Sequence, residues 1–346
     1  MNVEVPRRSA GALRRHRIPL PWPEDRQFRV LSIDGGGIRG VFPAAFLAGL
    51  EETYLRGQSV ADYFDLIAGT STGGIIALGL ASGLRASELR DVYVRRGCEI
   101  FPAPWTGVPG IVARQWKSFY RLFRYRYDRA ALARVLKDVL GDRTFGRATS
   151  RLCIPSFDGR HGEVYIFKTP HHPDFVRDGK ERMTKVAAAT GAAPTYFRPL
   201  QDGGYTFVDG GVWANNPAMI ALVDALTCFT VSRSGISILT LGCGDEPYVV
   251  GRSKLLFGGM FAWRDVIGAA MKFQSQNALG QAGLLIGGDR VVRIDVPEMD
   301  RLMELDDWRR AVLELPAAAK AAVVENGDRI AATFLSERAA PYAPVV

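Results

Sequence analysis

The sequence predicts an α/β fold in which helices cover both faces of a mostly parallel central sheet. Short apolar runs that suit buried strands alternate along the chain with longer segments of helical periodicity. This alternation is typical of parallel strands joined by crossover helices. Three predicted strands run directly into glycine-rich turns. In an open parallel sheet such turns meet at the carboxyl edge, where ligands bind.

Length and composition describe one large domain. The 346 residues are 47% hydrophobic and 23% charged, which is enough for a sizeable core. Residues 1–27, rich in Arg and Pro, are expected to form a loosely ordered basic arm before a single domain at 28–346. No apolar run approaches the ~20 residues of a membrane span, and no apolar stretch follows the first arginines as in an export signal. We therefore expect a cytoplasmic protein.

Seven segments are predicted to be strands, because each is a short apolar run with β-branched or aromatic residues that ends at a turn. They are 28–33, 63–68, 151–155, 164–168, 205–208, 236–241 and 291–296.

The segments between these strands have helical features. Apolar residues at helical spacing predict a helix over 41–54. Ser87 is expected to open a helix over 86–97, and Asp128 is expected to cap the amphipathic helix that follows it. The other predicted helices lie over 74–81, from Asp128 to about 140, through 186–190, from Asn216-Pro217 onward, within a 250–290 insertion and near 317–336.

The pentapeptide Gly69-Thr70-Ser71-Thr72-Gly73 is the most informative motif. It lies between a predicted strand and a predicted helix, and its flanking glycines suit a tight, strained turn. Such a nucleophile elbow presents the serine hydroxyl at the carboxyl edge of the sheet, above a helix N-terminus. An ordinary strand-to-helix loop of small residues is the alternative.

A serine becomes a nucleophile near neutral pH only with a base within hydrogen-bond reach. Asp209 ends a predicted strand and precedes Gly210 and Gly211. A carboxylate that faces the serine directly would form a Ser–Asp dyad, and a turn aspartate bonded to its own backbone is the alternative. His171 and His172 lie between prolines in a loop and are expected to be exposed structural residues.

The turn Asp34-Gly35-Gly36-Gly37-Ile38-Arg39-Gly40 follows the first predicted strand and opens a helix. Its bare amides would bind the oxyanion that develops during acyl transfer. Arg39 would lock this loop or meet an anionic head group. The spacing also matches a dinucleotide fingerprint, so a phosphate cradle in a non-catalytic nucleotide sensor is the alternative. The Gly-Lys-Ser/Thr of a P-loop does not occur.

Together the three turns resemble those of the patatin-like phospholipases, lipid acyl hydrolases that use a Ser–Asp dyad. The likeness covers about residues 28–245. It implies a three-layer α/β/α sandwich and the hydrolysis of acyl esters of membrane phospholipids, with no metal and no cofactor. By analogy Ser71 is the nucleophile and Asp209 is the base. The oxyanion hole comprises Gly35, Gly36 and Gly37, and the supporting residues are Arg39, Gly40, Gly69, Gly73, Gly210 and Gly211.

Within that family the chain is most similar to bacterial antiphage effectors that a cyclic nucleotide switches on, through the stretches 167–175 and 192–197. This resemblance implies a cyclic dinucleotide activator, peripheral contact with the inner membrane and no nucleic acid partner, and it leaves a homo-oligomer open. A constitutive lipase or esterase without nucleotide control is the alternative. Residues 250–346, a helical insertion and C-terminal part, have no counterpart that motifs assign.

The excess positive charge is confined to two segments. Residues 1–27 hold six arginines and three acids, and residues 101–129 hold six basic residues and one acid, which together account for the net charge of +8. Aromatic rings alternate with five basic residues, Arg126 among them, over 101–127. We expect this segment to dip into a lipid interface. Contact with a cyclic dinucleotide and simple packing on the core are the alternatives.

The cysteines have neither metal-ligand nor redox spacing, and the histidines complete no zinc pattern with them. We expect reduced, buried thiols at Cys98, Cys153, Cys228 and Cys243.

Overall fold

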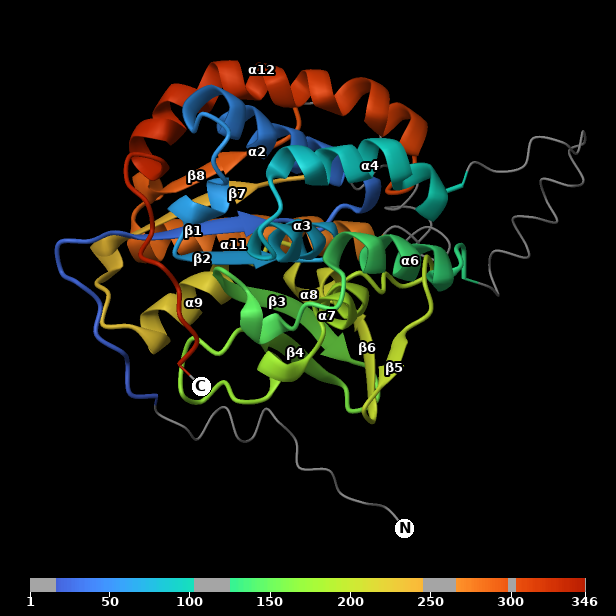
Figure 1. Cartoon of the computed structure of the whole chain (residues 1–346), viewed down its shortest axis with the longest axis horizontal. Coiled ribbons are helices and arrows are strands. Elements are labelled where there is room, and N and C mark those ends of the chain that lie inside the picture. Colours follow the sequence, from blue (N-terminus) through green and yellow to red (C-terminus); the bar gives the residue numbers. More distant parts are fainter. Residues whose placement is uncertain (1–16, 103–124, 245–265, 298–302, 346) are drawn as a thin grey trace, which may run out of the picture.

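The computed structural model describes residues 17–102, 125–244, 266–297 and 303–345, and it confirms the predicted α/β fold (Figure 1). One sheet runs through the middle of the described part, with strand order β5-β6-β3-β2-β1-β7-β8 and with β4 paired to β3. Helices pack on both faces of this sheet, which gives three layers.

The strands lie close to their predicted positions. Those from β3 through β2, β1 and β7 to β8 pair in parallel, whereas β4, β5 and β6 form antiparallel pairs beside β3. The short β5 was not predicted, because three residues carry too little periodicity. The bounds are Phe28–Ile33 (β1), Leu66–Gly69 (β2), Arg151–Asp158 (β3), Glu163–Lys168 (β4), Leu200–Asp202 (β5), Tyr205–Asp209 (β6), Ile236–Leu241 (β7) and Val291–Ile294 (β8).

The helices differ from prediction mainly at their first residues. Arg85, rather than Ser87, is the N-cap of α4, and its N–H donates to Glu88 at 2.8 Å. Asp128 caps α6 as predicted. α12 starts well before the predicted residue 317, because it accommodates Pro316 in its interior. The bounds are Val41–Tyr54 (α2), Thr72–Ala81 (α3), Ala86–Ile100 (α4), Arg129–Leu140 (α6), Met183–Thr190 (α7), Gly211–Ala214 (α8), Ala218–Cys228 (α9), Val266–Ile286 (α11) and Trp308–Phe334 (α12).

None of the helices within the described ranges is long and apolar enough to cross a bilayer.

Alternate residues of each central strand enter two separate cores. In β1, Leu31 and Ile33 pack with α2, α3, α4 and α12, which lie on one face of the sheet (Figure 1). Phe28 and Val30 pack on the other face, with α9 and α11. A strand that is buried on both faces has a continuous apolar sequence, and for this reason these strands could be predicted from the sequence.

The second half of the expected N-terminal arm is docked on the domain. Leu20 forms a parallel bridge with Phe229, and the ring of Trp22 lies 4.7 Å from that of Phe28 and 5.5 Å from that of Phe229. The expectation of a loosely ordered arm is therefore wrong for residues 17–27. The rest of the arm lies outside the described residues.

Strand β3 extends beyond the carboxyl end of its neighbour β2. Cys153 pairs with Ala68 near the end of β2, whereas Ser156, three residues further along, pairs with Asp209 of the antiparallel β6. The third glycine-rich turn therefore does not follow a parallel strand, as the sequence suggested. It reaches the same edge from the opposite direction, because the overhang of β3 supports it.

Replacing Trp22 with Ala should lower the free energy of unfolding by about 3 kcal/mol, because a large ring that is only 9% exposed would leave a cavity among Phe28 and Phe229. Urea denaturation measures this loss. The matched control is Ile18→Ala in the same segment, which should change little since Ile18 is 85% exposed. Equal midpoints for both variants would show that the segment does not stabilise the domain.

Candidate active site

Ser71 occupies the sharp turn between β2 and α3, in a backbone conformation that non-glycine residues rarely adopt. Its φ is 53° and its ψ is −118°. The two motif glycines permit this turn by close approach: a Cβ on Gly69 would lie 2.2 Å from the carbonyl oxygen of Gly73, and a Cβ on Gly73 would lie 2.2 Å from that of Ile33. These contacts explain the spacing of the pentapeptide and produce a nucleophile elbow rather than an ordinary loop.

Thr190 fixes the elbow from the end of α7. The N–H of Ser71 donates to Thr190 Oγ1 at 2.9 Å, and this hydroxyl donates in turn to the carbonyl oxygen of Pro155 at 2.6 Å. The chain Ser71–Thr190–Pro155 thus connects the turn to the overhanging part of β3. Sequence reasoning missed Thr190, because no motif marks a threonine so far along the chain as a partner of the elbow.

Asp209 lies beside the elbow. Its Oδ1 accepts the N–H of Gly211 at 2.7 Å, and the side chain of Ser71 is close enough to influence its charge. Burial raises the pKa of Asp209 from 3.8 to about 6, and the Ser71 side chain and the Gly211 N–H keep the pKa from rising further. The result is a carboxyl group poised to take up a proton near neutral pH while it faces a serine hydroxyl.

The glycine loop that begins at Asp34 lies against the same two turns. A Cβ on Gly35 would lie 3.4 Å from Ser71 Cβ, and the N–H of Gly35 donates to the carbonyl oxygen of Asn215 at 3.1 Å. The amide proton of Gly35 therefore already has an acceptor in this structure, and Gly35 leaves room for Ser71. The amides of Gly36 and Gly37 donate to no acceptor within the described ranges and remain candidate donors.

The predicted supporting residues hold these turns together. Arg39 Nε donates to the carbonyl oxygen of Gly36 at 3.4 Å, so Arg39 braces its own loop. A Cβ on Gly40 would lie 2.3 Å from Thr72 Oγ1, and one on Gly210 would lie 2.5 Å from the carbonyl oxygen of Pro155. Close backbone approach thus explains the small residues at both positions.

A model of the patatin-like phospholipase family matches residues 31–222, more than half of the chain. The chain belongs to the patatin-like phospholipase family. The matched segment includes the glycine loop, the elbow and the turn at Asp209, and it ends before β7, β8, α11 and α12.

Three bacterial relatives of the chain are named cGAMP-activated phospholipase. The one from Escherichia coli (strain TW11681) is 40% identical over 66% of this chain and 65% of the relative. The one from Vibrio cholerae is 39% identical over 66% of this chain and 68% of the relative. The one from Pseudomonas aeruginosa is 32% identical over 74% of this chain and 75% of the relative. The chain thus spans about two thirds to three quarters of the length of these three relatives.

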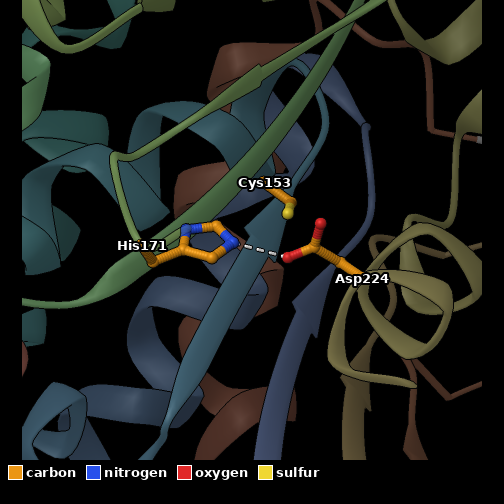
Figure 2. Close-up of side chains that lie close together, drawn as sticks. All are labelled: Cys153, His171 and Asp224. Carbon is orange, nitrogen blue, oxygen red and sulfur yellow. Dashed lines mark hydrogen bonds and ion pairs between the residues drawn. The ribbon is translucent and has the colours of Figure 1, made fainter. Parts of the chain in front are cut away.

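A second cluster of chemically active side chains lies in the core on the α9 side of the sheet. Figure 2 shows the His171 ring facing Asp224, with the thiol of Cys153 beside them. His171 Nε2 lies 2.6 Å from Asp224 Oδ2, and Lys168 Nζ forms an ion pair with Oδ1 of the same carboxylate. Burial would raise the pKa of Asp224, but Lys168 and His171 outweigh it and hold that pKa well below 3.8.

This cluster is an internal ion pair, and it fits a metal poorly. Ligand atoms of Cys153, His171 and Asp224 lie within 4.8 Å of one another, but the Lys168 ammonium already neutralises the carboxylate. Burial also raises the pKa of Cys153 well above 9.0, which keeps the thiol protonated. The expectation of exposed histidines is wrong, since His171 and His172 are 1% and 3% exposed. No motif in the sequence indicates that Asp224 lies beside this loop.

Cys153, Cys228 and Cys243 are free and buried as expected, whereas Cys98 is only partly buried.

The aromatic and basic segment at 101–127 lies mostly outside the described residues. Its last residues are described: Arg126 Nη1 lies 2.7 Å from Asp306 Oδ2, and the Tyr127 hydroxyl donates to the same oxygen at 2.5 Å. Arg126 was expected to meet lipid phosphates, but here an internal carboxylate neutralises it. The roles proposed for the rest of the segment stay predictions.

Lys168→Met should destabilise the protein by about 3 kcal/mol, because the buried carboxylate of Asp224 would lose its permanent cation. Lys180→Met, at an exposed lysine of the following loop, should have little effect. The double variant Lys168→Met/Asp224→Leu removes both charges and should be more stable than Lys168→Met alone. Chemical denaturation of the variants measures these differences. An unchanged free energy of unfolding in Lys168→Met would contradict the ion-pair assignment.

Proposed function

We propose that this chain is a serine lipid acyl hydrolase of the phospholipase A type, and that a cyclic nucleotide activates it in antiphage defence. The acyl esters of membrane phospholipids are its substrates, and it acts from the cytoplasm in peripheral contact with the inner membrane. The family membership and the names of the three relatives support this proposal.

One observation carries the chemistry: the side chain of Ser71, on a strained elbow, lies close enough to the buried carboxylate of Asp209 to lower its pKa. No histidine within the described ranges forms a hydrogen bond with Ser71, and His171 is bound to Asp224 in a different core. A base of pKa about 6 beside a serine hydroxyl suits proton abstraction at the pH of a cytoplasm.

The proposed reaction proceeds through an acyl-enzyme. Ser71 Oγ attacks the ester carbonyl carbon while its proton passes to Asp209, and the amides of Gly36 and Gly37 stabilise the oxyanion. Collapse of this intermediate expels the lysophospholipid alkoxide, which takes the proton from Asp209. Water then attacks the acyl group with Asp209 again as base, and the fatty acid leaves with Ser71 restored.

Ser71→Ala and Asp209→Asn should each lower phospholipid hydrolysis at least about a thousandfold, because the nucleophile and its base act as one unit. The assay uses vesicles of phosphatidylethanolamine and phosphatidylglycerol, with and without a panel of cyclic di- and trinucleotides that includes cGAMP. We expect strong stimulation by one member of the panel and little hydrolysis without it.

The outcomes of this assay separate the alternatives. Equal hydrolysis with and without nucleotides would indicate a constitutive lipase, and nucleotide binding without hydrolysis or fluorophosphonate labelling would indicate a sensor. Full activity in Ser71→Ala would overturn the mechanism.

The kcat/KM of the activated enzyme should fall as the pH drops through about 6. Asp209 must be ionised to accept the proton of Ser71, and its pKa of about 6 means that the protonated, inactive form prevails below that pH. A pH–rate profile on a soluble acyl ester measures this limb, with circular dichroism at each pH to verify folding. An acid limb centred near the ordinary aspartate pKa of 3.8 would contradict the assignment of Asp209 as base.

A further inference from the structure

Arg293 of β8 reaches across the edge of the sheet to the first residue of the glycine loop. Its Nη2 lies 2.9 Å from Asp34 Oδ2 and 2.5 Å from Asp295 Oδ2, and its Nη1 donates to Thr240 Oγ1 at 3.0 Å. The planar guanidinium therefore joins β8, the end of β7 and the residue that follows β1. These three elements lie far apart in the sequence.

The buried carboxylate of Asp34 depends on the Arg293 guanidinium for neutralisation of its charge. The residue is 2% exposed, and its backbone N–H is fixed separately by the carbonyl oxygen of Leu241 at 3.0 Å. A buried carboxylate is costly unless a partner neutralises it. Arg293 provides that charge, and so Asp34 is held at both its backbone and its side chain.

The cation itself is held in a fixed frame. Asp295 Oδ1 accepts the N–H of Gly244 and that of Val296, each at 2.8 Å, while Asp295 Oδ2 binds Arg293. Asp295 thus anchors the guanidinium that binds Asp34, and a movement of β8 would be transmitted to the loop.

We propose that Arg293 is a positioning residue for catalysis, which holds the amides of Gly36 and Gly37 in register with Ser71 through its ion pair with Asp34. This inference rests on the proposed hydrolase function. The two amides follow Asp34 by two and three residues, and oxyanion donors lose their effect when they move away from the developing charge. Arg293 lies outside the segment that the family model matches, so the family motifs do not mark it.

Arg293→Lys is the primary test, because it keeps one positive charge but loses the fork that binds three groups at once. We expect kcat on a soluble acyl ester to fall about 10- to 100-fold, with KM changed less than twofold. Fluorophosphonate labelling of Ser71 should slow by a similar factor. Arg290→Lys, just before the same strand, is the matched control, since Arg290 forms no ion pair within the described ranges.

Hydrogen exchange gives a second readout that requires no activity. In Arg293→Lys the backbone amides of residues 34–40 should exchange at least about fivefold faster than in the wild type, while those of the elbow helix α3 should stay unchanged. The double variant Asp34→Asn/Arg293→Met removes both partners and should fold better than Arg293→Met, while its kcat stays low.

Two results would overturn the inference: unchanged exchange over 34–40, or a loss of kcat that the unfolded fraction or a parallel rise in KM explains. Absence of Ser71-dependent labelling in the wild type, both with and without the nucleotide panel, would instead overturn the hydrolase function, and the exchange experiment would still decide whether Arg293 holds the loop.

Discussion

The left-handed backbone of Ser71 is the constraint on which the rest of the site depends. Such a conformation costs on the order of 1–3 kcal/mol at a non-glycine residue, and it persists only where the surroundings enforce it. Here the close contact of Gly69 with Gly73 and the hydrogen bond from the Ser71 N–H to Thr190 enforce it. A relaxed turn would take the hydroxyl away from Asp209. The packing of α3 against β1 and β2 therefore serves chemistry as well as stability.

The carboxylate of Asp209 illustrates how the site exchanges stability for reactivity. A folded-state pKa of about 6, against 3.8 in an exposed aspartate, means that ionised Asp209 costs about 3 kcal/mol at neutral pH. This loss of folding free energy decreases as the pH falls through 6 toward 3.8, because the folded state binds the proton more tightly than the unfolded chain does. The same burial that costs stability makes the carboxylate a stronger base toward Ser71.

The sequence predicted the parts of this molecule that are local. The strands of the parallel sheet are continuous apolar runs. The glycines on either side of Ser71 are required by a backbone contact within the same five residues. Relations between distant segments were not predictable: the antiparallel approach of Asp209, the support of Thr190 and the burial of His171 beside Asp224 all depend on tertiary packing. Gly35 shows a further limit of the sequence. A motif gives the position of an amide group, but it does not tell which oxygen accepts the amide proton.

The ribosome synthesises Ser71 and Asp209 before it synthesises the residues that hold the glycine loop in place. A nascent chain that has passed Asp209 already holds both members of the proposed dyad. The groups that fix the glycine loop come later: Leu241 and Arg293, and then Leu305, whose carbonyl oxygen accepts the N–H of Ile38 at 2.9 Å. At about 5–20 residues per second, several seconds of translation separate the two events. Synthesis thus produces the proposed nucleophile and base early, and the residues that hold the glycine loop last.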